Sequence, residues 1–171
     1  MSEKFWNSST LEPKRSHRWL VYLNGSNIPT YVAKKVDKPS FTINETEHKY
    51  FGHSFFYPGH VTWETISLTL VDPIEPDTSK TLMDILKDSG YSDPTDHPNG
   101  ALRTVSKADS VRALGPQVRI EQFTDDLESP VESWTLHNPW IKDAKFGNLA
   151  YDSDDMVEIE LTIRFDWATI G

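Results

Sequence analysis

The strongest constraint on the fold is the strict alternation of apolar and polar residues in MVEIELTIRFDWA, residues 156–168. Successive side chains of a β-strand point to opposite faces, so this pattern predicts one long strand with a dry face and a wet face. The wet face carries Glu158, Glu160 and Thr162. The dry face is apolar throughout: Val157, Ile159, Leu161, Ile163, Phe165 and Trp167. The first functional question is whether the wet face meets bulk water or another molecule.

Strands are predicted along most of the remaining chain. The expected strands are residues 17–25, 30–36, 40–51, 61–73, 117–124 and 131–141. Asn24-Gly25 is a strong turn signal and predicts a hairpin between the first two strands. The apolar parity changes between Trp63 and Ile66, which indicates a bulge near Glu64-Thr65, with two strands and a tight join as the alternative. Residues 55–60, FFYPGH, are expected to form an aromatic turn.

One α-helix is predicted, at about residues 79–89. Its apolar side chains recur at helical spacing and form a stripe: Leu82, Met83, Ile85 and Leu86. Residues 77–79 are candidate N-caps, and Gly90 is placed as a C-terminal stop. A helix of about three turns is marginal in isolation, so this one is expected to pack against the sheets.

The length of 171 residues predicts a single domain with a short arm. Residues 1–16 are polar and are expected to be an N-terminal arm, and residues 17–171 are expected to form the domain. Residues 91–116 form a long connection with three prolines and little periodicity. Connections of this length are often functional. The arm and this connection are therefore candidates for contacts between subunits, with ordinary flexible surface loops as the competing interpretation.

Composition excludes several classes of protein. The net charge of −9 argues against a grip on nucleic-acid phosphates, which requires clustered lysine and arginine. The absence of cysteine excludes disulfides, thiolate zinc sites and a cysteine nucleophile. No apolar run approaches the ~20 residues that span a bilayer, so no membrane insertion is expected. The N-terminus lacks an apolar signal segment, so nothing marks it for secretion, and the absence of cysteine fits synthesis in a host cytoplasm.

No constellation of residues predicts catalysis, a cofactor or a metal. His48, His53 and His60 have no metal-ligand spacing, and residues 152–155, DSDD, lack the glycine turn and distal acid of a calcium loop. No nucleophile elbow, phosphate loop or dinucleotide fingerprint occurs. We therefore expect no enzyme. The alternative from that class is a small-ligand β-barrel or a hydrolase built around His53 and His60.

The order of elements resembles a known family. VRIEQFTDD is followed by VESWTLHNPWIKDAKFGNLAYDSDD and then by VEIELTIRFDWA, and YVAKKVDKPSF precedes FYPGHVTWETISLTLVDP and the single helix. Over residues 17–168 this series is similar to the tail tube proteins of contractile, T4-like bacteriophages. Those proteins are related to baseplate proteins that initiate the tube and to type VI secretion tube proteins.

The resemblance implies a mainly β, two-sheet sandwich or barrel-like domain with one flanking helix. It implies a structural virion protein whose hexameric rings stack into a conduit for DNA, with tail sheath and baseplate proteins as partners. A baseplate protein that initiates or terminates the tube is the alternative. In such a ring the wet face with Glu158, Glu160 and Thr162 would line the lumen. An acidic lumen would repel phosphates and let DNA slide without specific binding.

Overall fold

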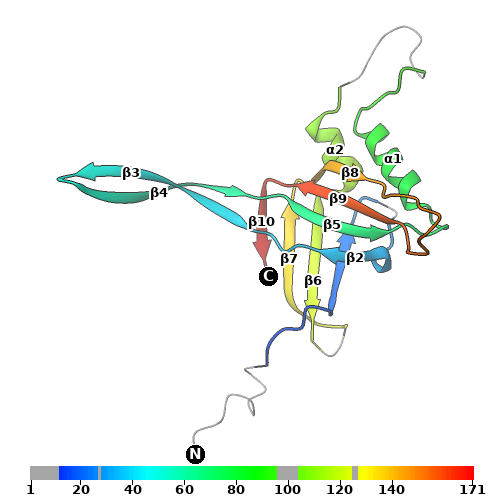
Figure 1. Ribbon diagram of the computed structural model, residues 1–171, viewed down its shortest axis with the longest axis horizontal. Coiled ribbons are helices and arrows are strands. Elements are labelled where there is room, and N and C mark those ends of the chain that lie inside the picture. The colour runs from blue at the N-terminus through cyan, green and yellow to red at the C-terminus, as the bar shows by residue number, and fades with distance from the viewer. Residues whose placement is uncertain (1–11, 27, 96–103, 125–126) are drawn as a thin grey trace, which may run out of the picture.

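Two four-stranded antiparallel sheets form the body of the computed structural model, which describes residues 12–26, 28–95, 104–124 and 127–171 (Figure 1). The first sheet has the order β1-β6-β7-β10, with the bounds Trp19–Leu23, Gln117–Phe123, Pro130–His137 and Trp167–Ile170. The second sheet has the order β2-β5-β9-β8, with the bounds Ala33–Val36, Ile66–Val71, Glu158–Arg164 and Trp140–Lys145. A short 3-10 helix, Thr30–Val32, precedes β2.

The core lies between these two sheets. Its centre is built from side chains of the first sheet, Val118 and Leu136, and of the second sheet, Leu68, Leu161 and Ile163, each at most 1% exposed. Removing such aliphatic surface from water is the main favourable term in folding. The expected mainly β, two-sheet fold is confirmed. The predicted dry face of β9 supplies one wall of the core.

Two helices lie beside each other and cover part of the body (Figure 1). Helix α1, Thr78–Asp88, matches the predicted one, and the Asp77 side chain accepts a hydrogen bond from the Lys80 N–H at 3.0 Å. Helix α2, Lys107–Leu114, lies inside the 91–116 connection and was not predicted. It has only eight residues, and its only large apolar side chains are Val111 and Leu114, so its helical periodicity is a weak signal. No helix among the described residues is long and apolar enough to cross a bilayer.

A long two-stranded hairpin projects from the body (Figure 1). It consists of β3, Phe41–Tyr50, and β4, His53–Trp63, and its turn is at Phe51-Gly52. Both turn residues have positive φ, 48° and 77°. The prediction of an aromatic turn at residues 55–60 is wrong, because these residues lie in the middle of β4. The aromatic side chains favour extended backbone there in spite of Pro58-Gly59.

The predicted hairpin across Asn24-Gly25 is also wrong. Strand β1 pairs with β6 and β2 pairs with β5, so the turn carries the chain from one sheet to the other. The Gly25 N–H donates to the Leu114 carbonyl at 3.0 Å, and a Cβ on Gly25 would lie 2.3 Å from the Gly115 nitrogen. The glycine is therefore required by a close approach of two backbones and does not mark a strand reversal.

Two predicted continuous strands are broken where the chain changes sheet. Glu64-Thr65 separates β4 from β5, so the bulge interpretation is wrong and the alternative of two strands with a tight join is correct. The alternating segment 156–168 is split into β9 and β10, which belong to different sheets. At the corner the Asp166 N–H donates to the His137 carbonyl at 3.0 Å. Beyond it Trp167 is 46% exposed and stacks on His137.

Candidate assembly surface

The β3–β4 hairpin exposes apolar side chains that the body leaves uncovered. Phe51 at the turn is 84% exposed, and seven further apolar side chains of the hairpin are at least 48% exposed: Phe41, Ile43, Tyr50, Phe55, Phe56, Tyr57 and Val61. An isolated two-stranded hairpin is at best marginally stable in water. Exposed apolar side chains concentrated on one projecting element are typical of a site of interaction with another macromolecule.

The register divides this apolar surface between the two faces of the hairpin. Near the root, Phe41 and Ile43 lie opposite Trp63 and Val61 and share one face with them. A bulge then changes the pairing to Glu45 with Pro58. Beyond the bulge, the opposite face carries two aromatic residues of β4, which lie across from polar residues of β3 in the pairs Thr46–Tyr57 and His48–Phe55. Both faces therefore present aromatic rings to solvent, and a partner can cover either.

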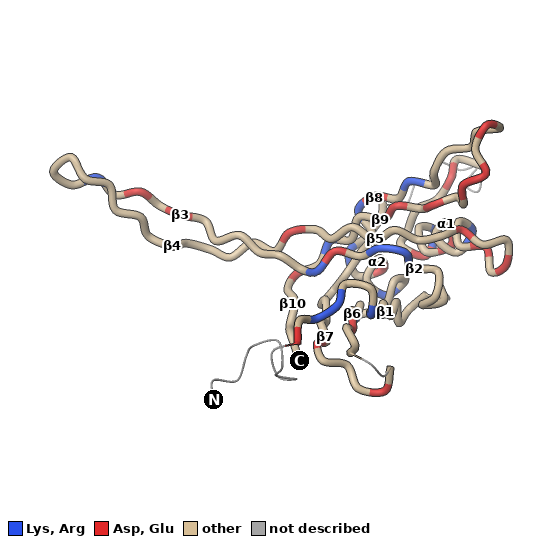
Figure 2. Tube along the Cα trace, turned by 60° about the horizontal axis from the view of Figure 1, so that its bottom comes forward, with Lys and Arg blue, Asp and Glu red and all other residues tan. Residues whose placement is uncertain are grey.

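The hairpin also has open edges and few charges. Its charged residues are Glu45, Glu47 and Lys49, all on β3, and the eleven-residue β4 has none. Figure 2 shows this contrast: the hairpin is mostly tan, whereas acidic and basic positions are interspersed over the body. Among the described residues its sheet contains only β3 and β4, so both outer edges lack a neighbouring strand. A long, uncharged edge strand is a template for pairing with another chain.

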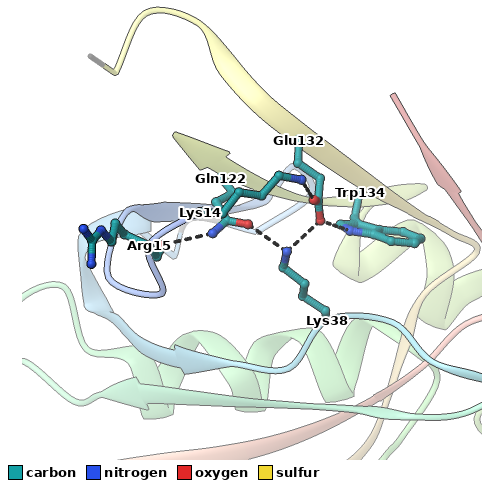
Figure 3. A network of polar contacts seen from close by, with 6 residues as sticks. All are labelled: Lys14, Arg15, Lys38, Gln122, Glu132 and Trp134. Carbon is teal, nitrogen blue, oxygen red and sulfur yellow. Dashed lines mark hydrogen bonds and ion pairs between the residues drawn. The ribbon is translucent and has the colours of Figure 1, made fainter. Parts of the chain in front are cut away.

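A buried carboxylate joins the root of the hairpin to the first sheet (Figure 3). Glu132 of β7 is 7% exposed and forms ion pairs with Lys14 and Lys38. The Trp134 indole N–H donates to the same carboxylate at 2.5 Å, and Lys38 also donates to the Gln122 side chain at 2.7 Å. Hydrogen bonds from Lys14 and then Lys38 lower the pKa of Glu132 to about 2. The carboxylate is therefore ionised at neutral pH.

Of the expected N-terminal arm, residues 12–16 are described and residues 1–11 lie outside the described part. The described end of the arm contacts the same place on the sheet, since the Gln122 amide donates to the Arg15 carbonyl at 2.9 Å (Figure 3). Residues 96–103 of the expected 91–116 connection also lie outside the described part.

The predicted wet face of β9 is on the solvent side of the second sheet. Glu158 forms an ion pair with Lys34, Glu160 lies opposite Lys145 of β8, and Thr162 lies opposite Asp143. The three residues therefore share one face, but lysines accompany both glutamates. The face has mixed charge and is not uniformly acidic. Its assignment to a lumen stays a prediction.

The residues considered for catalysis are not brought together. His53 and His60 are exposed residues of β4, as is His48 of β3. Residues 152–155 are exposed, and within them the Ser153 hydroxyl donates to Asp155 at 2.8 Å. The described residues contain no group of three histidine or acidic side chains placed to hold a metal ion. The hairpin surface was missed from the sequence, although the uncharged, aromatic run of residues 53–63 was a signal for it.

Comparisons with known proteins are informative at the level of structure. No family model and no curated protein matches the sequence. A chain in the cryo-EM structure of the anti-feeding prophage tube-terminating cap is similar, with a TM-score of 0.68 and 15% identity, covering 94% of this chain and 91% of that one. A chain of the anti-feeding prophage baseplate has a TM-score of 0.64 and 18% identity over 94% and 96% of the two chains.

A chain from the sheath/tube terminator of an extracellular contractile injection system, PVC, gives a TM-score of 0.63 and 18% identity over 94% and 97%. The sheath-tube complex of the same system contains a similar chain, with a TM-score of 0.64. This chain therefore has the fold of tube, cap and baseplate components of contractile injection systems. The resemblance expected from the order of elements is confirmed at the level of the fold.

Proposed function

We propose that this protein is a structural subunit of the tube of a contractile, phage-tail-like apparatus. Copies close into hexameric rings, and the rings stack into a conduit inside a sheath and on a baseplate. The observation that carries the proposal is the exposed apolar hairpin on a fold otherwise seen in such assemblies. In a monomer this apolar surface stays exposed to water, whereas a repeating assembly would bury it in every copy.

Two kinds of contact support a stacked ring. Strands β1, β10, β2 and β8 are the edges of the two body sheets, and edge strands can pair with those of a neighbour until a closed ring leaves none open. The hairpin reaches beyond the body and fits a contact with a further copy (Figure 1). Head-to-tail contacts close into a ring when the rotation permits, while contacts along the axis continue indefinitely.

The solvent face of β9 is our candidate for the channel wall, with Glu158, Glu160 and Thr162 directed at the lumen. The surrounding lysines keep its charge mixed, so passing DNA would neither bind tightly nor be strongly repelled. Replacing Glu158 and Glu160 with lysine is expected to slow DNA ejection from particles that carry the variant. The matched control replaces two exposed acidic residues of α1, Asp84 and Asp88, with lysine and so makes the same change in net charge elsewhere. Unaltered ejection by the β9 variant would remove this assignment.

A protein that initiates or terminates the tube is the second candidate. The chains of the anti-feeding prophage cap and of the PVC terminator have TM-scores of 0.68 and 0.63 with this one, close to the 0.64 of the PVC sheath-tube chain. The two roles differ in one measurable property. A tube subunit polymerises into long rods, whereas a terminator forms single rings that add to a tube end and stop its growth.

Negative-stain electron microscopy of the purified, concentrated protein tests the proposal, with and without a baseplate from the same virion as a seed. Rods are expected for the tube subunit and isolated sixfold rings for an initiator or terminator. A protein that stays monomeric in both samples, with the hairpin shown to be folded by hydrogen exchange, would overturn both assignments.

A further inference from the structure

We infer that Glu132 is a positioning residue that fixes the direction of the β3–β4 hairpin relative to the body. It does so by holding Lys38 at the root of the hairpin, and it ties the N-terminal segment to the same point through Lys14 (Figure 3). The consequence for assembly rests on the proposed function. The mechanical role itself belongs to the single chain and is testable without any ring.

The backbone leaves the direction of the hairpin poorly defined at its root. On the β3 side the Asp37 N–H is the last to bond to the second sheet, donating to the Ser67 carbonyl at 3.0 Å. The Ser40 carbonyl already bonds within the root, accepting from the Glu64 N–H at 2.9 Å. Lys38 and Pro39 lie between these two points, and proline has no N–H to donate. A short segment without sheet pairing joins the two rigid parts, as at a hinge.

The Lys38 side chain reaches from this unpaired segment to the first sheet. Its ammonium lies 2.7 Å from a Glu132 carboxylate oxygen and 2.7 Å from the Gln122 side-chain oxygen. Both acceptors lie on paired strands, Gln122 on β6 and Glu132 on β7, and each side chain has a further hydrogen bond, to Arg15 and from Trp134 respectively. Charge-assisted hydrogen bonds are the stronger kind, and a buried carboxylate that loses its partner is costly. The lysine is therefore held at a defined place.

A second attachment lies on the other strand of the root. The Trp63 ring of β4 packs against Phe165 with centroids 6.1 Å apart, and Phe41 of β3 packs edge-on against Trp63 at 5.4 Å. One attachment alone leaves a hairpin free to pivot about it. The aromatic contact on the β4 side and the ion pair on the β3 side together define a direction.

The N-terminal segment uses the second oxygen of the same carboxylate. Lys14 pairs with Glu132 through Oε2, while Lys38 pairs through Oε1. Arg15 is fixed beside it by the hydrogen bond from Gln122. Two ammonium groups thus share one buried carboxylate, and a displacement of the arm during assembly acts on the group that holds the hairpin.

The test measures the hairpin direction in the monomer. The chain has no cysteine, so spin labels at Thr46→Cys on β3 and Asp84→Cys on α1 are the only labels introduced. Double electron–electron resonance at low protein concentration then gives the distance distribution between hairpin and body. Glu132→Gln and Lys38→Met are expected to broaden this distribution roughly twofold, because the hinge loses one of its two attachments.

Lys34→Met is the matched control. It removes another exposed lysine that is ion-paired with a carboxylate, that of Glu158, at the end of β9 farther from Phe165. Lys38→Met leaves Glu132 paired with Lys14, so this variant keeps the test decisive if Glu132→Gln does not fold. An unchanged distribution in folded Lys38→Met would overturn the inference.

Ring and rod formation is scored separately from the hairpin direction. An absence of assembly in every variant counts against the proposed function and leaves the hinge measurement valid.

Discussion

Single backbone positions decide whether the main chain can close up at the ends of two paired strands of the first sheet, β1 and β6. Gly25 follows β1 and Gly115 precedes β6, and their main chains approach so closely that no Cβ fits between them. Gly115 also has φ of +105°, which L side chains rarely adopt. The pair therefore has both a steric and a conformational reason to be glycine.

Gly115→Ala is expected to destabilise the protein by about 2–4 kcal/mol, since the new Cβ lies 2.4 Å from the Gly25 nitrogen and the positive φ adds strain. Urea unfolding measures the loss. Gly52→Ala is the matched control, because it has φ of +77° but no atom within 4 Å of the added Cβ. Its cost of about 1 kcal/mol isolates the strain alone. Equal losses in the two variants would contradict the steric account.

Because of Glu132, the free energy of unfolding depends on pH in the acidic range. Hydrogen bonds from Lys14 and Lys38 lower its pKa from 4.5 to about 2, so the folded protein resists protonation that the unfolded chain accepts. The stabilisation is complete above the unfolded pKa and is lost as pH falls from 4.5 toward about 2. Urea unfolding at about pH 6 and about pH 3 is expected to show a smaller decrease in Glu132→Gln than in the unmodified protein.

The pKa of Asp166 is also lowered, chiefly by Lys107, and it weakens the protein in acid in the same direction. Because Asp166 is present in both proteins, the difference between their acid sensitivities reports Glu132 alone. Identical decreases would show that the carboxylate of Glu132 is not the group that titrates in this range.

At the scale of one element, the burial pattern of the hairpin differs from that of the strands of the body. Strands β5 and β9 alternate buried and exposed side chains, whereas β3 and β4 are exposed almost from end to end. Aromatic residues with high strand propensity hold the hairpin extended although no core lies beneath it. Packing within the chain therefore does not explain its apolar content, which is why we assign the hairpin to a contact with another copy.

Phe55→Ser together with Tyr57→Ser is expected to abolish rod formation while changing the free energy of unfolding by less than about 0.5 kcal/mol. Both rings are about half exposed, on one face of the hairpin, so their removal costs little in the monomer. Electron microscopy and urea unfolding measure the two effects. Ile74→Ser, which removes a fully exposed side chain elsewhere, is the control for general hydrophobicity. Rods formed by the double variant would contradict an assembly role for this face.

At the scale of the whole molecule, the protein consists of a body with its own core and a projecting hairpin, to which we assign a contact between copies. The hydrophobic core draws on both sheets and on α1 and α2, and from the hairpin only Trp63 packs against it. Figure 1 shows the same division, with the hairpin extending away from the layers. We therefore expect the body to fold without the hairpin. The hairpin is expected to contribute to contacts between copies and little to the stability of the monomer.

Replacing residues 42–62 with Asn-Gly is expected to leave a cooperatively folded monomer. Phe41 and Trp63 are directly opposite each other, which is the spacing that a two-residue hairpin turn requires. Thermal unfolding and analytical ultracentrifugation measure folding and association. A variant that unfolds without cooperativity would show that the hairpin belongs to the core, and one that still forms rods would show that the hairpin is not needed for stacking.

The sequence by itself determined the local elements: the dry face of β9, helix α1 with its Asp77 cap, and a mainly β fold. These follow from side-chain periodicity and capping, which act over a few neighbouring residues. Only the tertiary structure decided that Asn24-Gly25, Glu64-Thr65 and Asp166 lie where the chain passes from one sheet to another. It also decided that β4 continues through Pro58-Gly59, with a bulge at that place. Each of these depends on contacts between residues far apart in the chain, such as Gly25 with Leu114, which no local pattern encodes.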